Sequence, residues 1–104
     1  MLHRIVKMTF QPERIEDFLS FFHERKHKIA GFPGCQSLRL LQDIKHDNVV
    51  FTYSIWEKEE DLEAYRHSEL FIDTWKITKA MFAEKAQAWS VDSLVYLHEN
   101  GDNS

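Results

Sequence analysis

Four stretches of the chain alternate between hydrophobic and polar residues, which is the pattern of β-strands with two unlike faces. In "LHRIVKMTF" the side chains of Val6, Met8 and Phe10 fall on one side, and those of His3 and Lys7 fall on the other. The stretch "VVFTYSIWE" is rich in β-branched and aromatic residues, which favour strands. The predicted strands span residues 2–10, 35–42, 49–57 and 86–98.

Between these stretches the hydrophobic positions recur every three or four residues, which predicts amphipathic helices. Pro12 suits the first position of the first helix, where its missing N–H costs nothing, and Gly31 suits the end of that helix. Ser68 is placed to cap the last helix through its hydroxyl. The predicted helices span residues 12–29, 57–67 and 68–85.

The order of these elements, β-α-β-β-α-α-β, predicts an α+β protein of the ferredoxin-like, split βαβ type. We expect a four-stranded antiparallel sheet with helices on one face. A chain of 104 residues has room for one domain, which we place at residues 1–98. The polar end "ENGDNS", residues 99–104, is expected to be a flexible C-terminal tail.

The helices of such a fold cover only one face of the sheet. The third strand nevertheless offers large side chains to both faces, with Phe51, Tyr53 and Ile55 on one. Val50 and Trp56 lie on the other. An uncovered apolar sheet face would promote aggregation of a monomer. We therefore expect a homodimer in which the sheets of two identical subunits pack face to face.

Composition narrows the classes of function. The net charge of -4 argues against nucleic acid as a partner, because nucleic acid binding needs a dense basic surface. The hydrophobic runs are too short to span a membrane and no signal peptide is evident, so we expect a cytoplasmic protein without a membrane partner. With three glycines the chain has no glycine-rich phosphate-binding loop. Its single cysteine, Cys35, excludes an internal disulfide.

The stretch "YRHSELF", residues 65–71, is the main candidate for chemistry and has two interpretations. In the first it is the joint between two helices, with Arg66 and His67 at the negative end of one and Ser68 capping the next. In the second, Tyr65 and His67 face a cleft between the helices and the sheet. Only a phenol or an imidazole in this stretch can hold or accept a phenolic proton near neutral pH. The two interpretations can coexist.

Aromatic residues offer a place for a flat substrate. Trp56, Phe71 and Trp75 are candidates for the walls of a pocket, since a small domain rarely needs so many large rings to fill its core. A metal site is not expected. His23 and His27 stand four residues apart, a spacing that can bind a metal, but their charged surroundings suggest no third ligand.

Two segments carry a resemblance to a known family. "FPGCQSLRLLQD" (32–43) is similar to a Gly-Cys turn that leads into a second strand. "FTYSIWEKEEDLEAYRHSELF" (51–71) is similar to a third strand, an acidic short helix and the start of the next helix. In these segments the chain resembles the antibiotic-biosynthesis monooxygenase branch of the dimeric α/β barrels. The resemblance implies that fold, a homodimer and, as one of several activities of the superfamily, oxygenation without a cofactor.

The chain departs from this family at defined positions. Members often have histidines where this chain has Tyr65 and Leu70. The haem-degrading branch resembles the same segment, but its axial histidine would fall at Trp75, and its asparagine on the first strand has no counterpart. An indole N–H is only a donor and cannot ligate iron. We therefore expect neither haem nor any other cofactor.

These observations leave two functions open. The first is a cofactor-independent monooxygenase for a small aromatic substrate of the phenol or quinol type, whose anion would itself reduce dioxygen in an apolar cleft. His67 or Tyr65 would handle the proton. The substrate ring would be bound by Trp56, Phe71 and Trp75. The second function is a non-catalytic dimeric module of the same fold that binds a small aromatic molecule or a protein.

Overall fold

The structure is a computed structural model that describes residues 1–98 of the chain. It contains the predicted elements in the predicted order. The elements are β1 (Leu2–Thr9), the 3₁₀ turn η1 (Pro12–Arg14), α1 (Ile15–Ala30), β2 (Cys35–Gln42), β3 (Val49–Trp56), α2 (Glu59–Arg66), α3 (Glu69–Lys79) and β4 (Gln87–Asp92).

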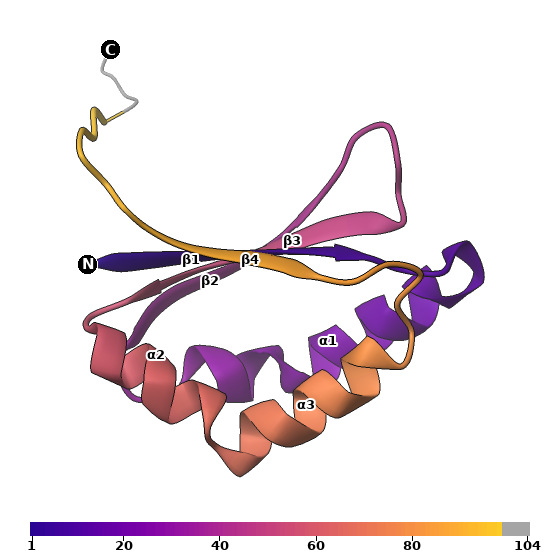
Figure 1. Cartoon of the computed structure of the whole chain (residues 1–104), viewed down its shortest axis with the longest axis horizontal. Coiled ribbons are helices and arrows are strands. Elements are labelled where there is room, and N and C mark those ends of the chain that lie inside the picture. The colour runs from indigo at the N-terminus through magenta and orange to yellow at the C-terminus, as the bar shows by residue number, and fades with distance from the viewer. Residues whose placement is uncertain (99–104) are drawn as a thin grey trace.

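The three helices cover one face of a four-stranded antiparallel sheet, and the other face is open (Figure 1). This is the α+β, ferredoxin-like arrangement that the order of elements predicts. No helix in the described part of the chain has the length and apolar character needed to cross a membrane. The predicted tail, 99–104, lies outside the described residues.

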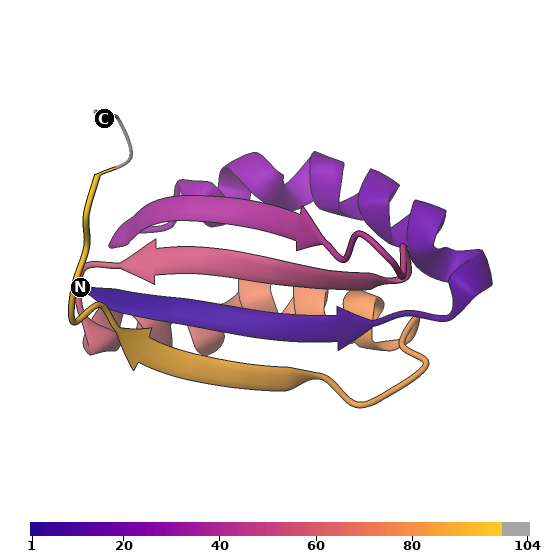
Figure 2. The same ribbon diagram turned by 90° about the horizontal axis from the view of Figure 1, so that it is seen from above.

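The strands are arranged in the order β2-β3-β1-β4, so that β1 lies between β3 and β4 (Figure 2). In the register of β1 and β3, Met8 pairs with Val50 and Leu2 pairs with Trp56. Residues that pair directly point to the same face of a sheet. The apolar sides of β1 and β3 therefore form one continuous surface toward the helices.

The hydrophobic core lies between this surface and the helices. Phe10 and Phe18 stack with their ring centroids 4.3 Å apart, which attaches α1 to the end of β1. Burial of each large apolar side chain stabilises the fold by about 1.5–3 kcal/mol. The buried hydrophobic residues are Met8, Phe10, Ile15, Phe18, Phe22, Ile29, Val50, Trp56, Leu62, Tyr65 and Met81.

The opposite side of the sheet, which we call the open face, also carries hydrophobic side chains, as the alternation along the strands predicts. Its hydrophobic residues are Ile5, Leu41, Val49, Phe51, Tyr53, Ile55, Trp89 and Val91. Trp89 and Val91 are each 44% exposed. His3 and Tyr53 also meet here, with 2.6 Å between Nδ1 and Oη. The described part of the chain thus leaves an apolar surface uncovered.

The last strand is shorter than the pattern indicates. β4 ends at Asp92, whereas the prediction extended to residue 98. Asp92 pairs with Leu2, the first residue of β1, so a longer strand would have no neighbouring strand within the subunit. The segment 93–98 instead leaves the sheet (Figure 1). It exposes apolar side chains, among them Leu94 at 92% and Tyr96 at 77%.

The last helix is also shorter than predicted, because α3 ends at Lys79 rather than continuing toward β4. The chain beyond it is tied to the end of β1 by backbone hydrogen bonds. The Gln11 N–H donates to the Met81 carbonyl at 3.0 Å, and the Ala83 N–H donates to the Thr9 carbonyl at 2.8 Å. These bonds replace the helical ones that the hydrophobic spacing favoured.

Gly34 forms the turn before β2 at a position that suits only glycine. Its φ is +91°, which L-residues avoid, and an added Cβ would overlap the side chain of Asp61. We expect Gly34→Ala to destabilise the protein by about 2 kcal/mol, which lowers Tm by roughly 10 °C at this size. Thermal denaturation checks this. Gly31→Ala is the control, since φ there is -87° and the loss should be smaller. Equal melting of the two variants would contradict this account of the turn.

Candidate active site

A cavity of about 420 Å³ lies between the helices and the sheet. Its volume is in the range of pockets that hold small molecules. Residues of the sheet and residues of the helices both line it. The lining includes Arg4, Val6 and Met8 of β1, Ser54 and Trp56 of β3, Tyr65 and Arg66 of α2, and Phe71, Thr74 and Trp75 of α3.

Four aromatic rings, of Trp56, Tyr65, Phe71 and Trp75, form a continuous aromatic wall along this cavity. Trp56 and Tyr65 stack with centroids 5.1 Å apart, and Tyr65 meets Phe71 edge-on, also at 5.1 Å. Phe71 stacks on Trp75 at 5.8 Å. The structure thus brings together four of the five residues that the sequence proposes for a site. Such a wall suits a flat apolar ring.

Tyr65 is the member of the aromatic wall with a hydroxyl. Its side chain is 9% exposed, and its hydroxyl has no hydrogen-bond partner within residues 1–98. Burial raises the pKa of the Tyr65 phenol well above its usual range, and the neighbouring Cys35 acts in the same direction. The hydroxyl therefore stays protonated at neutral pH and acts as a donor. A buried donor without a partner is available to a ligand.

The helix joint predicted for "YRHSELF" is present. The Oγ of Ser68 caps α3 by accepting a hydrogen bond from the Phe71 N–H at 3.1 Å. The same hydroxyl donates to the carbonyl of Tyr65 at 2.6 Å. The cap therefore connects α2 to α3 and holds Tyr65 and Phe71 in their places in the aromatic wall. This stretch is a joint, and it also supplies two of the four rings.

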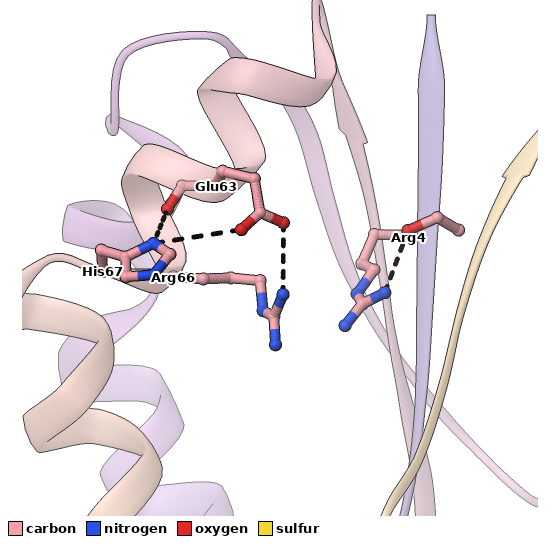
Figure 3. Close-up of polar contacts among 5 residues, drawn as sticks. Arg4, Glu63, Arg66 and His67 are labelled. Carbon is pink, nitrogen blue, oxygen red and sulfur yellow. Dashed lines mark hydrogen bonds and ion pairs between the residues drawn. The ribbon is translucent and has the colours of Figure 1, made fainter.

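His67 lies away from the cavity. Its side chain is 80% exposed, and its Nδ1 donates to the backbone carbonyl of Glu63 at 2.8 Å (Figure 3). The same nitrogen lies 3.9 Å from a carboxylate oxygen of Glu63. The imidazole is thus placed at the outer end of α2, where positive charge complements the helix dipole. The structure does not bring His67 together with Tyr65.

Two arginines line the cavity, and the sequence pattern assigned neither to a site. The Nη1 of Arg4 donates to the Oγ of Ser90 on β4 at 2.9 Å. Arg66, at the end of α2, pairs with Glu63 at 3.2 Å. Burial and, secondly, the charge of Arg66 lower the pKa of Arg4, while Glu63 opposes this. The alternation along the first strand could have indicated Arg4, because it places this charged side chain on the same, apolar face as Val6.

The described lining of the cavity contains no carboxylate, imidazole or lysine. Its ionisable groups are Arg4, Tyr65 and Arg66. Within residues 1–98 no group of three histidine, cysteine or acidic side chains is arranged to hold a metal ion. The cavity can therefore bind a ring, donate hydrogen bonds and hold negative charge, but it does not contain an evident base.

The fold and the cavity define a class of protein, a ferredoxin-like α+β domain with a space for a small ligand between its sheet and its helices. A family model described as antibiotic biosynthesis monooxygenase matches residues 1–76, which is most of the chain. The chain therefore belongs to the antibiotic biosynthesis monooxygenase family. No curated protein sequence matches the chain significantly.

Several solved structures share the fold. An antibiotic biosynthesis monooxygenase superposes with a TM-score of 0.85 at 21% identity, over 91% of this chain and 100% of its own. A conserved protein from Methanosarcina mazei superposes with a TM-score of 0.81 at 15% identity, over 88% of this chain and 91% of its own. The protein Rv0793 from Mycobacterium tuberculosis superposes with a TM-score of 0.83 at 10% identity, over 93% of this chain and 98% of its own. At such identities the likeness establishes the fold alone.

Proposed function

We propose that the protein is a monooxygenase that acts, without a bound cofactor, on a small phenol-like or quinol-like aromatic compound. The observation that carries the proposal is the buried hydroxyl of Tyr65, which has no partner within residues 1–98 and stands in the aromatic wall of a ligand-sized cavity. Family membership supports the class of reaction. The ring of the substrate would lie along Trp56, Phe71 and Trp75.

The substrate supplies the electrons in this reaction. Tyr65 donates a hydrogen bond to the phenolic oxygen of the substrate, which stabilises the phenolate in an apolar site. The phenolate reduces dioxygen, and a C–O bond forms at a ring carbon. That carbon then loses its hydrogen as a proton, the O–O bond breaks, and the second oxygen atom leaves as water. The product is a quinone, and no external reductant is needed.

The phenolic proton leaves to solvent in this proposal. The described lining of the cavity offers no carboxylate or imidazole. Tyr65 keeps its own proton, because burial raises the pKa of its phenol. The sequence suggested His67 for the proton, but its imidazole is 80% exposed at the outer end of α2. A direct role for His67 would need a substrate that extends out of the cavity.

Oxygen consumption with a panel of dihydroxybenzenes and dihydroxynaphthalenes tests the proposal. We expect protein-dependent uptake with at least one compound, and no uptake with the dimethyl ether of that compound, which cannot ionise. With isotope-labelled dioxygen, one labelled atom should appear in the quinone and the other in water. Heat-denatured protein is the control for autoxidation.

A non-catalytic binding module is the alternative function, and the absence of an evident base in the described lining favours it. In that case the same compounds should bind, as measured by calorimetry, while oxygen uptake stays at the rate of the denatured control. This result would contradict the proposed reaction and leave the cavity as a binding site.

We also propose that the protein is a cytoplasmic homodimer whose subunits pack their open faces together. The open face exposes Trp89 and Val91, and an apolar surface of this kind favours association. The segment 93–98, which exposes Leu94 and Tyr96, continues from the edge strand β4 beyond its own sheet. A second subunit would bury these side chains.

A further inference from the structure

Two guanidinium groups line the same cavity and face one another across it (Figure 3). Arg4 comes from β1 and Arg66 from α2, and their side chains point toward one another across the space between the sheet and the helix (Figure 3). Each arginine lines the cavity next to the aromatic wall. The rings and the positive charges therefore belong to a single space.

The positive charge of these two groups is only partly compensated. Glu63 pairs with Arg66 at 3.2 Å, and His67 shares the same glutamate. Arg4 donates to Ser90, a neutral hydroxyl, and no carboxylate among residues 1–98 forms an ion pair with it. Burial and the neighbouring Arg66 both disfavour the charge of Arg4, as the lowered pKa of its guanidinium shows. An anion between the two arginines would relieve this repulsion.

We propose that the ligand of the cavity is an aromatic acid, whose carboxylate is bound by Arg4 and Arg66 while its ring lies along the aromatic wall. A guanidinium presents paired N–H donors that match the two oxygens of a carboxylate. The inference rests on the proposed function and narrows its substrate from a phenol to a phenolic acid. The contact of Arg4 with Ser90 keeps the guanidinium oriented before the ligand arrives.

The test compares two ligands of nearly the same shape, 6-hydroxy-2-naphthoate and 6-hydroxy-2-naphthamide, of which only the first carries a negatively charged group in place of a neutral amide. We expect calorimetry to show that the acid binds about tenfold more tightly than the amide, as a charge-assisted hydrogen bond predicts. Arg4→Gln and Arg66→Gln should each weaken binding of the acid about tenfold and binding of the amide much less, so that most of the preference for the acid is lost. Added salt should weaken binding of the acid but not of the amide.

Arg14→Gln is the matched control. Arg14 pairs with Asp17 at 3.0 Å at the start of α1, and its side chain is 41% exposed, close to the 43% of Arg66. It does not line the cavity, so the preference for the acid should persist in this variant. Because Arg4 is partly buried, the more exposed Arg66 provides a variant that should retain the fold, which melting curves verify.

The possible outcomes separate this inference from the proposed function. Equal binding of acid and amide by the wild type would overturn the anion site and leave the cavity as a binding site. The same conclusion follows if Arg4→Gln and Arg66→Gln weaken binding of the acid and of the amide equally. It also follows if these variants change the preference for the acid no more than Arg14→Gln does. If neither ligand binds, the anion site and the proposed ligand cavity are both overturned.

Discussion

Replacing Tyr65 by phenylalanine is expected to lower kcat at least a hundredfold with little change in stability. The ring and its stacking on Trp56 are kept, and only the hydroxyl is lost. Loss of one donor to a developing oxyanion typically costs about 10²–10³ in kcat. The hydroxyl has no partner within residues 1–98, so its removal leaves no protein group unsatisfied, and Tm should stay the same or rise slightly. Oxygen uptake with the best compound of the panel and thermal denaturation measure the two effects.

His67→Gln is the matched control for this variant. It removes an imidazole that lies two residues further along the chain but points away from the cavity. We expect its oxygen uptake to stay close to that of the wild type. Full activity in Tyr65→Phe would overturn the role given to the Tyr65 hydroxyl. Loss of activity in His67→Gln alone would instead support the proton-transfer role that the sequence suggests for His67.

Replacing Trp89 by aspartate is expected to convert the proposed dimer into a folded monomer. Trp89 pairs with Ile5 of β1 on the open face and is 44% exposed in the single subunit, so the subunit tolerates a polar side chain there. Loss of a tryptophan that is buried at an interface weakens association by about 2 kcal/mol or more, which is roughly 30-fold in Kd. A buried unpaired carboxylate weakens it further. Sedimentation velocity over a range of concentrations measures the change.

Ile72→Asp is the control for the dimer experiment. Ile72 is 57% exposed, but it lies on α3, on the other side of the sheet from the open face. This variant should sediment like the wild type. If Trp89→Asp also stays dimeric, the subunits do not meet through the open face. A wild-type protein that is monomeric at micromolar concentration would make the homodimer proposal wrong.

The order of elements could be predicted because it depends on local patterns. The alternation in "VVFTYSIWE" predicts a strand at 49–57, and β3 is Val49–Trp56. The acidic first turn and the apolar spacing predict a helix at 57–67, and α2 is Glu59–Arg66. A strand places successive side chains on opposite faces, and a helix repeats every 3.6 residues. Both periods can be detected without knowing which elements become neighbours.

The candidate site was only partly predictable. Tyr65 and His67 looked like partners because they are close in sequence. Two residues that stand two positions apart on a helix differ in direction by about 200°, so near its end one points inward when the other points outward. The structure accordingly buries Tyr65 and exposes His67. The period of the helix is therefore sufficient reason for these two side chains to lie on opposite sides of α2.

The sequence by itself determined the fold class, the family, the apolar side chains on both faces of the sheet and the rings that line the cavity. Only the tertiary structure decided where α3 and β4 end, since both ends depend on pairing with β1. It also decided that Arg4 and Arg66, which are far apart in the sequence, line one cavity. Such features arise from contacts between segments that are distant in the sequence, and the local spacing of hydrophobic residues does not reveal them. Where these contacts compete with local preference they outweigh it, because they bury more surface and satisfy more hydrogen bonds.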